Sequence, residues 1–564
     1  MSSVAPYPVD RANANIARHL GLMAAAQPTR PALKIPRGRS RKRGIDYLTL
    51  DFAELDAEVN AWAARLTAAG AKPGDRTLVM VRQGLPLIAS VFALFRIGAI
   101  PVVIDPGMGR KNFLACVARS RPRVLVGIPV ARLMSRIFRA AFSSVMVRVP
   151  ASGSLTARLG SRSGAASAPE AGVCWPAGAG DLAAVLFTSG STGAPKGVCY
   201  EHGMFEAQVQ LIRETYGIAP GEIDLPMLPI FALFNPALGM TTVVPEIDPR
   251  RPAEVDAARI VQAIQQEGVT NSFGSPTLWH KIAQHCAANN IKLPSLRRVL
   301  CAGAPVPAAL WAASHDFLPT GKLHSPYGAT EALPVTSIYS DEIDLTSVRG
   351  SCVGRPLDRV DVKVVRITDA PIATLVEASP RPEGEIGEII VRGPNVTKTY
   401  DGLPPATAAA KIRHHYDTLG HDRTEVWHRM GDCGYFDAHG RLWFCGRKAE
   451  RVETAIGTLH TEPCEQVFRS HPRVSRCALI GLGERPNQRA AIVVETKVRN
   501  SADGRVFARE LRKLALEHDH TTPIKLFYFC EKFPVDVRHN AKIHRLSLAH
   551  WAATAIGFES DPKR

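Results

Sequence analysis

Long apolar runs and targeting signals are missing from this 564-residue sequence. No uninterrupted apolar run reaches the roughly 18 residues that would suggest a membrane-spanning helix. The nearest stretch, residues 87–104, contains Ser90, Arg96 and Gly98, and we predict that it forms a buried helix followed by a buried strand. The N-terminus lacks the apolar core of a secretion signal, so a cytoplasmic location is expected.

Several recognisable site patterns are also missing. The eleven cysteines include no Cys-x-x-Cys pair, which argues against a zinc site or a disulfide framework and favours reduced thiols. No Walker A loop can be drawn, and Gly178-Ala-Gly180 lacks the third glycine of a dinucleotide fingerprint. No Gly-x-Ser-x-Gly elbow marks a hydrolase nucleophile. The chemistry must therefore be sought elsewhere.

Acidic residues are in deficit, with 52 Asp and Glu against 69 Lys and Arg, a net charge of +17. Nucleic-acid binding is one explanation of such a charge. However, the basic clusters at residues 37–43 and 158–162 fall in predicted loops and lack the interleaved aromatic residues of a stacking platform. We therefore expect no nucleic-acid partner, and favour a solvated surface or attraction for anionic substrates.

The chain is too long for a single hydrophobic core, so at least two domains are expected. Ile16, Leu20 and Met23 stand at helical spacing and predict that residues 1–30 are helical, and a hairpin is expected from residues 31–35 and 46–50. Asp51-Phe-Ala-Glu54 resembles a capping box that opens the next helix. The helix and strand alternation that follows is typical of doubly wound α/β sheets.

The pattern turns to strands between about residue 350 and residue 446, and then returns to two short α/β units. The expected fold class is therefore α/β and α+β. A large N-terminal domain, residues 1–446, would combine doubly wound sheets with a β-rich subdomain. A small, mobile α+β domain would occupy residues 447–564.

The most informative motif follows the apolar strand predicted at residues 183–187. Glycines let backbone N–H groups turn inward, hydroxyls add donors, and a lysine adds a point charge, so the loop can wrap a polyphosphate. A flexible linker is the plainer alternative, but linkers rarely follow a buried strand so closely. The loop residues are Thr188, Ser189, Gly190, Ser191, Thr192, Gly193 and Lys196.

Four further motifs accompany this loop. They are Cys301-Ala-Gly-Ala-Pro305, Tyr327-Gly-Ala-Thr-Glu331, Met430-Gly-Asp432 with Arg447, and Arg538-His-Asn-Ala-Lys542-Ile-His-Arg545. Three of them have an ordinary structural explanation when taken alone: a helix cap at Thr330, a turn at Asp432 with a surface ion pair at Arg447, and an exposed lysine at Lys542. Together with the phosphate loop, they favour a nucleotide site.

The combination resembles the adenylate-forming superfamily, which includes acyl-CoA synthetases, luciferases and peptide-synthetase adenylation domains, and the resemblance covers nearly the whole chain. It implies that ATP and Mg²⁺ are bound, with Glu331 holding the Mg²⁺ and Thr330 contacting the α-phosphate. It further implies that Lys542 is the catalytic lysine. The remaining nucleotide contacts implied are Gly303, Ala304 and Pro305, Tyr327 and Gly328 at adenine, and Asp432 and Arg447 at the ribose.

Residues 200–206, 229–239 and 538–543 are similar to the β-lactone synthetases of bacterial long-chain olefin biosynthesis. That resemblance implies a 2-alkyl-3-hydroxy fatty acid as substrate. ATP would activate its carboxylate as acyl-AMP with release of pyrophosphate, and its own 3-hydroxyl would close a β-lactone and release AMP. Neighbouring thiolase, reductase and lactone-decarboxylase enzymes would be possible partners.

Three departures from CoA ligases support this choice. Ala232 replaces a histidine, Ala449 replaces the hinge Asp or Lys, and Ile456 precedes the glycine where Lys or Arg is usual. The alternatives are a fatty acyl-AMP or acyl-CoA ligase and, in another class, a non-catalytic nucleotide-binding scaffold. Candidates for the acyl pocket are Phe231, Phe234 and Pro236, for which ordinary core packing is an equally good explanation.

Overall fold

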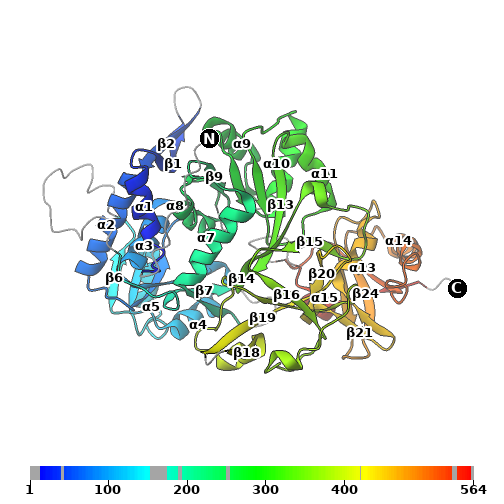
Figure 1. Ribbon diagram of the computed structural model, residues 1–564. Coiled ribbons are helices and arrows are strands. Elements are labelled where there is room, and N and C mark those ends of the chain that lie inside the picture. Colours follow the sequence, from blue (N-terminus) through cyan, green and yellow to red (C-terminus); the bar gives the residue numbers. More distant parts are fainter. Residues whose placement is uncertain are drawn as a thin grey trace.

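The structure, a computed structural model, describes residues 13–39, 44–152, 174–188, 194–248, 254–418, 421–535 and 543–560 (Figure 1). The expected basic cluster at 158–162, phosphate-loop residues Ser189 to Gly193 and the candidate lysine Lys542 lie outside these ranges. None of the helices within them has the length and apolar character needed to cross a lipid bilayer.

A six-stranded sheet in the order β6–β5–β3–β4–β7–β8 forms the first α/β layer, and only β8 runs antiparallel to its neighbour. Its strands are β3 Arg76–Met80, β4 Ile100–Ile104, β5 Val124–Gly127, β6 Val147–Pro150, β7 Leu182–Thr188 and β8 Lys196–Glu201. One face packs against α1 (Arg18–Ala26), α2 (Phe52–Ala68) and α3 (Leu85–Arg96), and the other against α4 (Arg110–Ser120) and α5 (Pro129–Ile137). The buried helix and strand predicted over residues 87–104 are thus confirmed.

A second, longer sheet begins with parallel strands in the order β13–β12–β11–β9–β10–β1 and ends at the antiparallel β2. The strands are β1 Pro31–Arg39, β2 Ile45–Asp51, β9 Ile223–Pro226, β10 Thr241–Val243, β11 Asn271–Gly274, β12 Arg298–Cys301 and β13 Lys322–Ala329. Helices α9 (Ala257–Glu267), α10 (Pro276–Ala288) and α11 (Ala308–Phe317) pack on it. Helix α7 (His202–Tyr216) contacts β8 and β14 (Ala332–Tyr339), one strand from each sheet.

The predicted β-rich region continues this sheet through antiparallel strands, β14–β15–β20–β19–β17–β16, with β18 paired to β19. The bounds are β15 Ser351–Pro356, β16 Asp361–Val365, β17 Gly387–Arg392, β18 Lys411–Thr418, β19 His421–Phe436 and β20 Leu442–Arg447, with α12 at Pro404–Ala410. The sheet therefore runs without a break from the second α/β layer into the β-rich region.

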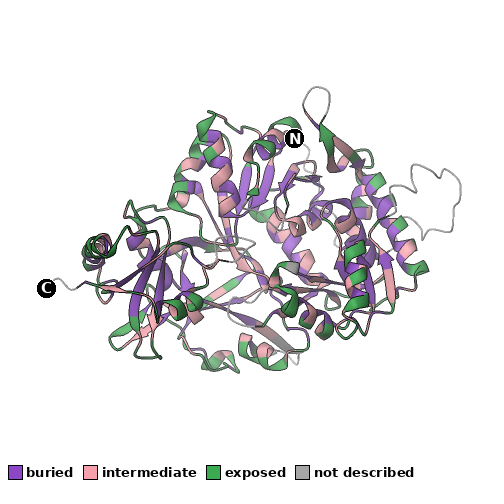
Figure 2. Ribbon diagram, turned by 180° about the vertical axis from the view of Figure 1, so that it is seen from behind, coloured by how far each residue is buried: buried purple, intermediate pink, exposed green. Residues whose placement is uncertain are grey.

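A smaller four-stranded sheet, β23–β24–β25–β26, closes the chain. Its elements are α13 Thr461–Arg469, β23 Cys477–Leu482, β24 Arg489–Glu495, α14 Ser501–Leu516, β25 Leu526–Cys530, α15 Arg545–Ala552 and β26 Phe558–Glu559, preceded by the hairpin β21 (Val452–Thr454) and β22 (Gly457–Leu459). It has cores of its own. Figure 2 shows buried strands inside each layer and exposed outer helix faces. The mixed α/β fold with a smaller C-terminal part matches the expected fold class.

Two local predictions can be checked directly. The side chain of Asp51 accepts the Glu54 N–H at 2.7 Å, and the Glu54 carboxylate accepts the Asp51 N–H at 3.1 Å, so the capping box is confirmed. Thr330 does not cap a helix. It lies in the tight turn between the antiparallel strands β13 and β14, and Tyr327 lies in β13 shortly before this turn.

Candidate functional site

A cleft of about 2610 Å³ opens where the two large sheets, the β-rich region and the C-terminal part meet. The parallel strands β7 and β12 end at it, and loops at the carboxyl ends of such strands are the usual ligand sites of α/β folds. Described residues from every nucleotide motif line the cleft: Thr188, Lys196, Gly303, Ala304, Pro305, Tyr327, Gly328, Thr330, Glu331, Asp432 and Arg447.

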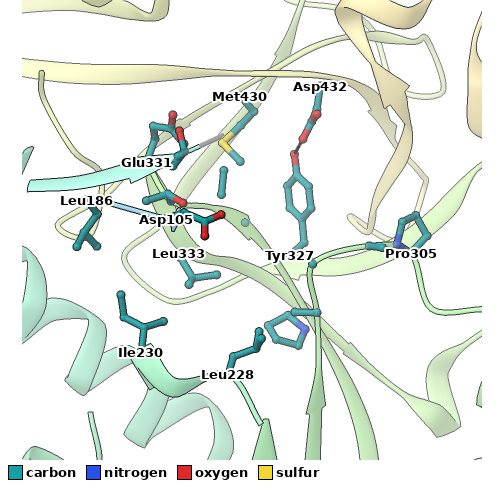
Figure 3. A pocket seen from close by; sticks show the side chains of 18 of the residues that line it. Asp105, Leu186, Leu228, Ile230, Pro305, Tyr327, Glu331, Leu333, Met430 and Asp432 are labelled. Carbon is teal, nitrogen blue, oxygen red and sulfur yellow. Dashed lines mark hydrogen bonds between the residues drawn. The ribbon is translucent and has the colours of Figure 1, made fainter. Parts of the chain in front are cut away.

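Tyr327, Asp432 and Arg447 form a polar chain along one wall of the cleft, and Figure 3 shows the Tyr327 hydroxyl pointing at Asp432. The Tyr327 hydroxyl donates to Asp432 Oδ2 at 2.6 Å, and the Arg447 guanidinium forms an ion pair with Asp432 Oδ1, with the two atoms 2.9 Å apart. Adjacent strands β19 and β20 place Asp432 directly opposite Arg447. The nearby Asp432 carboxylate raises the pKa of Arg447, so the guanidinium stays charged.

This wall suits a nucleoside. A carboxylate has two acceptor oxygens, enough for both hydroxyls of a ribose. Gly328 beside it must be glycine, because a Cβ there would lie 2.6 Å from the Ala332 carbonyl oxygen. Gly303 has a φ of +97°, a backbone conformation that other residues rarely adopt. Both glycines bring main chain to the cleft surface.

Glu331 is held by a second network. Tyr400 donates its hydroxyl to Glu331 Oε1 at 2.8 Å. The backbone carbonyl of Glu331 accepts the Thr397 N–H at 2.9 Å and the Thr397 hydroxyl at 3.0 Å. The neighbouring Thr330 carbonyl accepts the Tyr200 hydroxyl. The carboxylate is therefore fixed in the cleft by side chains from distant parts of the chain.

Two lysines lie beside the Tyr400 ring, with Lys196 Nζ 4.9 Å and Lys411 Nζ 5.9 Å from its centroid. Lys411 is buried and donates to the Thr397 carbonyl and, at 3.1 Å, to the Thr397 hydroxyl. Burial lowers the pKa of Lys411 to about 7. His428 lies opposite Lys411 on β19, and burial lowers the pKa of His428 well below its usual value, so its imidazole is neutral at pH 7.

A magnesium ion fits this chemistry. Within the described ranges, no three His, Cys, Asp or Glu side chains are grouped to form a complete metal site. A single fixed carboxylate, Glu331, suits Mg²⁺, because this ion is usually bound by one or two carboxylates together with substrate phosphates and water. The described ends of the phosphate loop frame the same region, since β7 ends at Thr188 and β8 begins at Lys196.

Apolar side chains form another part of the cleft lining, here called the apolar wall, which includes Leu186, Leu228, Ile230 and Leu333, labelled in Figure 3. Phe231 and Phe234 also line it, and Phe231 stacks on Phe273 with ring centroids 3.6 Å apart. Pro236 is buried in α8 (Asn235–Leu238) and is not among the lining residues. Ala232 is buried, Ala449 lines the cleft, and Ile456 is exposed on the β21–β22 turn.

The described residues of the C-terminal motif, 543–545, lie at the cleft. Ile543, His544 and Arg545 line it, and Val535 pairs with Ile543 across the segment that contains Lys542. Arg545 is held by Glu450 at 2.9 Å and by Glu465 at 2.8 Å. The residues next to Lys542 are thus anchored at the site.

Comparison with known proteins agrees with this geometry. The sequence profile of the AMP-binding enzyme family matches residues 23–401. The chain belongs to the AMP-binding enzyme family. It is 42% identical to an olefin beta-lactone synthetase of Stenotrophomonas maltophilia (strain K279a), over 96% of this chain and 98% of that protein. It is also 42% identical to an olefin beta-lactone synthetase of Xanthomonas campestris pv. campestris, over 96% and 97%.

Solved structures of AMP-binding enzymes share the fold. ATP-bound MatB from Rhodopseudomonas palustris superimposes with a TM-score of 0.74, covering 96% of this chain and 99% of that one at 21% identity. At this identity the similarity supports the architecture alone. The adenylate-forming resemblance inferred from the motifs is therefore confirmed at the level of family and fold.

Three residues of this AMP-binding enzyme escaped the sequence analysis: Thr397, Tyr400 and Lys411. None belongs to a recognisable motif, and Tyr400 lies 69 residues from the glutamate that it binds. A lysine on a strand with apolar neighbours is a weak sequence signal, since most lysines are exposed. Only tertiary folding shows that these side chains surround Glu331.

Substitution of Lys411 by methionine should change how the stability of the AMP-binding enzyme depends on pH. The folded pKa is about 7, whereas an unfolded lysine titrates near pH ~10.4. Between these values the unfolded chain holds one more proton, so this site makes the free energy of unfolding rise with pH, by at most about 1.4 kcal/mol per unit. Lys411→Met removes that contribution.

Chemical denaturation at pH 7 and pH 9 measures the effect. The free energy of unfolding of wild type minus that of Lys411→Met should be larger at pH 9 than at pH 7. Lys398→Met is the matched control, because the Lys398 side chain is 52% exposed. A wild-type to Lys411→Met difference that is the same at both pH values would contradict a depressed pKa.

Proposed function

We propose that this AMP-binding enzyme activates the carboxylate of a 2-alkyl-3-hydroxy fatty acid with ATP and Mg²⁺, and then closes the acyl-AMP to a β-lactone. The observation that carries the proposal is one cleft that is lined by the ribose wall, the fixed Glu331 and the apolar wall. The curated relatives that are 42% identical over nearly the full chain are olefin beta-lactone synthetases.

In the first step, a carboxylate oxygen of the acid attacks the α-phosphorus of ATP, the bond to the β-phosphate breaks, and pyrophosphate leaves. Asp432, oriented by Tyr327 and Arg447, binds the ribose and fixes the α-phosphate in position. Thr188 and Lys196 bind the phosphates together with Ser189 to Gly193. Glu331 would hold Mg²⁺, which supplies charge neutralisation of the phosphates when it is bound.

In the second step, the 3-hydroxyl oxygen attacks the acyl carbon, its proton leaves, and the bond to AMP breaks. The mixed anhydride is a reactive acyl donor, which offsets the strain of a four-membered ring. Holding the hydroxyl beside the carbonyl makes the step intramolecular, worth up to ~7–11 kcal/mol of the barrier. No separate acceptor is needed, in keeping with Ala232 and Ala449 at positions where CoA ligases carry functional side chains.

Lys542 is proposed as the catalytic lysine, carried by a small domain of residues 447–564 that moves against residues 1–446. Its charge would stabilise the negative charge that develops on the α-phosphate. Ile543 to Arg545, which follow it directly, line the cleft. Enzymes that supply the hydroxy acid or consume the lactone are the proposed partners in the cell.

Incubation with ATP, Mg²⁺ and a synthetic 2-alkyl-3-hydroxy acid tests the proposal, with product analysis in the presence and absence of CoA. Lactone and AMP formed in equal amounts without CoA are expected. The matched control is the same acid without its 3-hydroxyl, which should give acyl-AMP and no lactone. Product that forms only with CoA would assign an acyl-CoA ligase instead, and acyl-AMP as the final product from the hydroxy acid would assign an acyl-AMP ligase.

A further inference from the structure

Residues 106–150 are basic to a degree unmatched by the rest of the chain. They contain nine Lys or Arg residues and no Asp or Glu. The nine are Arg110, Lys111, Arg119, Arg121, Arg123, Arg132, Arg136, Arg139 and Arg148. Arg123 pairs with Asp75, whereas the five exposed ones, Arg110, Lys111, Arg121, Arg136 and Arg139, form no ion pair with a carboxylate in the described part of the chain. Their charge therefore faces solvent.

The same segment exposes apolar side chains on α5. Ala131 and Ser135 of this helix are buried against the sheet. Val130, Leu133 and Ile137 are 60%, 56% and 62% exposed. Their spacing of three and four residues puts all three on one outward face. Apolar surface of this kind, bordered by basic residues, is typical of a helix that lies in the plane of a membrane interface.

Helix α5 lies at the rim of the molecule (Figure 1). It connects β5 to β6, and β6 is the edge strand of the six-stranded sheet. Arg148 at the start of β6 donates to the Ser135 hydroxyl at 3.0 Å, which ties the inner face of the helix to that edge. The outward face and the sheet edge thus form one side of the protein.

This face adjoins the cleft. Ile128, Val130 and Met134 are among the residues that line it, together with Met108 and Phe113 of the preceding elements. Val130 is both cleft-lining and exposed, so the outer face of α5 borders the cleft. A ligand with long alkyl chains that approaches along α5 would therefore meet apolar side chains at this border of the cleft.

We propose that the face formed by α5 and the exposed basic residues of 106–150 docks on anionic phospholipid membranes and admits the fatty substrate to the cleft from the bilayer. The arginines and lysine would bind lipid phosphates, and Val130, Leu133 and Ile137 would enter the headgroup region. The admission of substrate rests on the proposed function, because an acid with two alkyl chains partitions into lipid. The docking itself does not depend on it.

The charge decides between possible occupants. A second copy of this chain would bring the same basic face, which opposes self-association across it. An anionic bilayer attracts it, since each basic residue near such a surface strengthens binding. An acidic protein partner would carry the same negative charge as the bilayer. A bilayer, however, also accommodates the apolar side chains beside the arginines.

Flotation of the full-length protein with vesicles, without ATP or fatty acid, tests the docking. The probe vesicles are an equal mixture of phosphatidylglycerol and phosphatidylcholine, compared with pure phosphatidylcholine. Binding is expected to the anionic vesicles only and to weaken in high salt. Arg136→Gln/Arg139→Gln should weaken binding about five-fold for each arginine, and Leu133→Glu/Ile137→Glu about tenfold or more.

Exposed positions far from α5 provide matched controls. Val376 is 86% exposed, and the Arg489 and Arg499 side chains are 64% and 86% exposed. Val376→Glu and Arg489→Gln/Arg499→Gln should bind vesicles like wild type. Lactone formation from a short-chain, water-soluble hydroxy acid should be equal in all variants, so a failure of the proposed reaction would be seen separately from a failure to dock.

Three outcomes would overturn the proposal. These are no binding to anionic vesicles, equal binding to both vesicle types, and anionic binding that the α5 variants retain. A dimer in light scattering that only the α5 variants convert to monomer would assign the face to self-association instead.

Discussion

Replacement of Glu331 by glutamine should lower the rate of acyl-AMP formation by about 100- to 1000-fold. The substitution keeps the size of the side chain and removes the charge that would hold Mg²⁺ against the phosphates. Tyr400 can still donate to the amide oxygen, so the local fold should survive. Pyrophosphate release at saturating ATP and acid, measured over a range of Mg²⁺ concentrations, gives the effect directly.

Tyr400→Phe is the companion variant. It leaves the carboxylate but removes the 2.8 Å hydrogen bond that orients it, and loss of such an orienting contact typically costs about 10–100-fold in metal affinity or activity. Its main effect should be a higher Mg²⁺ requirement, with a maximal rate closer to wild type. If Glu331→Gln released pyrophosphate at the wild-type rate and with the wild-type Mg²⁺ dependence, Glu331 would not be the metal-binding residue.

The second large effect is expected for Lys542→Ala. Removal of a positive charge that acts on the transition state should slow adenylation by about 100- to 1000-fold. ATP should still bind, because the ribose wall of Tyr327, Asp432 and Arg447 is intact. A single-turnover assay of acyl-AMP formation, combined with calorimetry of ATP binding, separates the two effects.

Lys532→Ala is the control for this experiment, since Lys532 is an exposed lysine in the same part of the chain. It should adenylate like wild type. Unchanged single-turnover adenylation by Lys542→Ala would refute the catalytic role, whereas an equal loss of ATP binding and rate would reassign Lys542 to nucleotide affinity.

Much of the local structure could be predicted because it depends on neighbours in sequence. The capping box at Asp51 and Glu54 joins residues three apart, and the hairpin of β1 and β2 joins consecutive strands. The spacing of Leu20 and Met23 indicates the buried face of α1, which the structure confirms. Interactions of this range are encoded in short windows of sequence.

The helix cap considered for Thr330 shows the limit of such reasoning. Tyr-Gly-Ala-Thr-Glu is compatible with a helix start, but residues 332–339 form a strand that pairs with β13 and with β15. Pairing with strands distant in sequence therefore decided the local conformation. The same dependence explains why β-propensity is a weaker guide than helix propensity.

By itself, the sequence determined the family, the order of α/β and β-rich regions and a set of nucleotide-motif residues that line the cleft, because glycine, hydroxyl and carboxylate side chains at set spacings have few other uses. Tertiary structure alone decided which of them cooperate. Tyr327 and Asp432 are 105 residues apart, and Glu331 and Tyr400 are 69 apart. Lys411 becomes a buried lysine beside Thr397 only in the folded protein. Likewise, only packing shows that one face of α5 remains uncovered beside the cleft. Hydrogen-bond partners and burial are properties of long-range packing, which no local pattern of residues specifies.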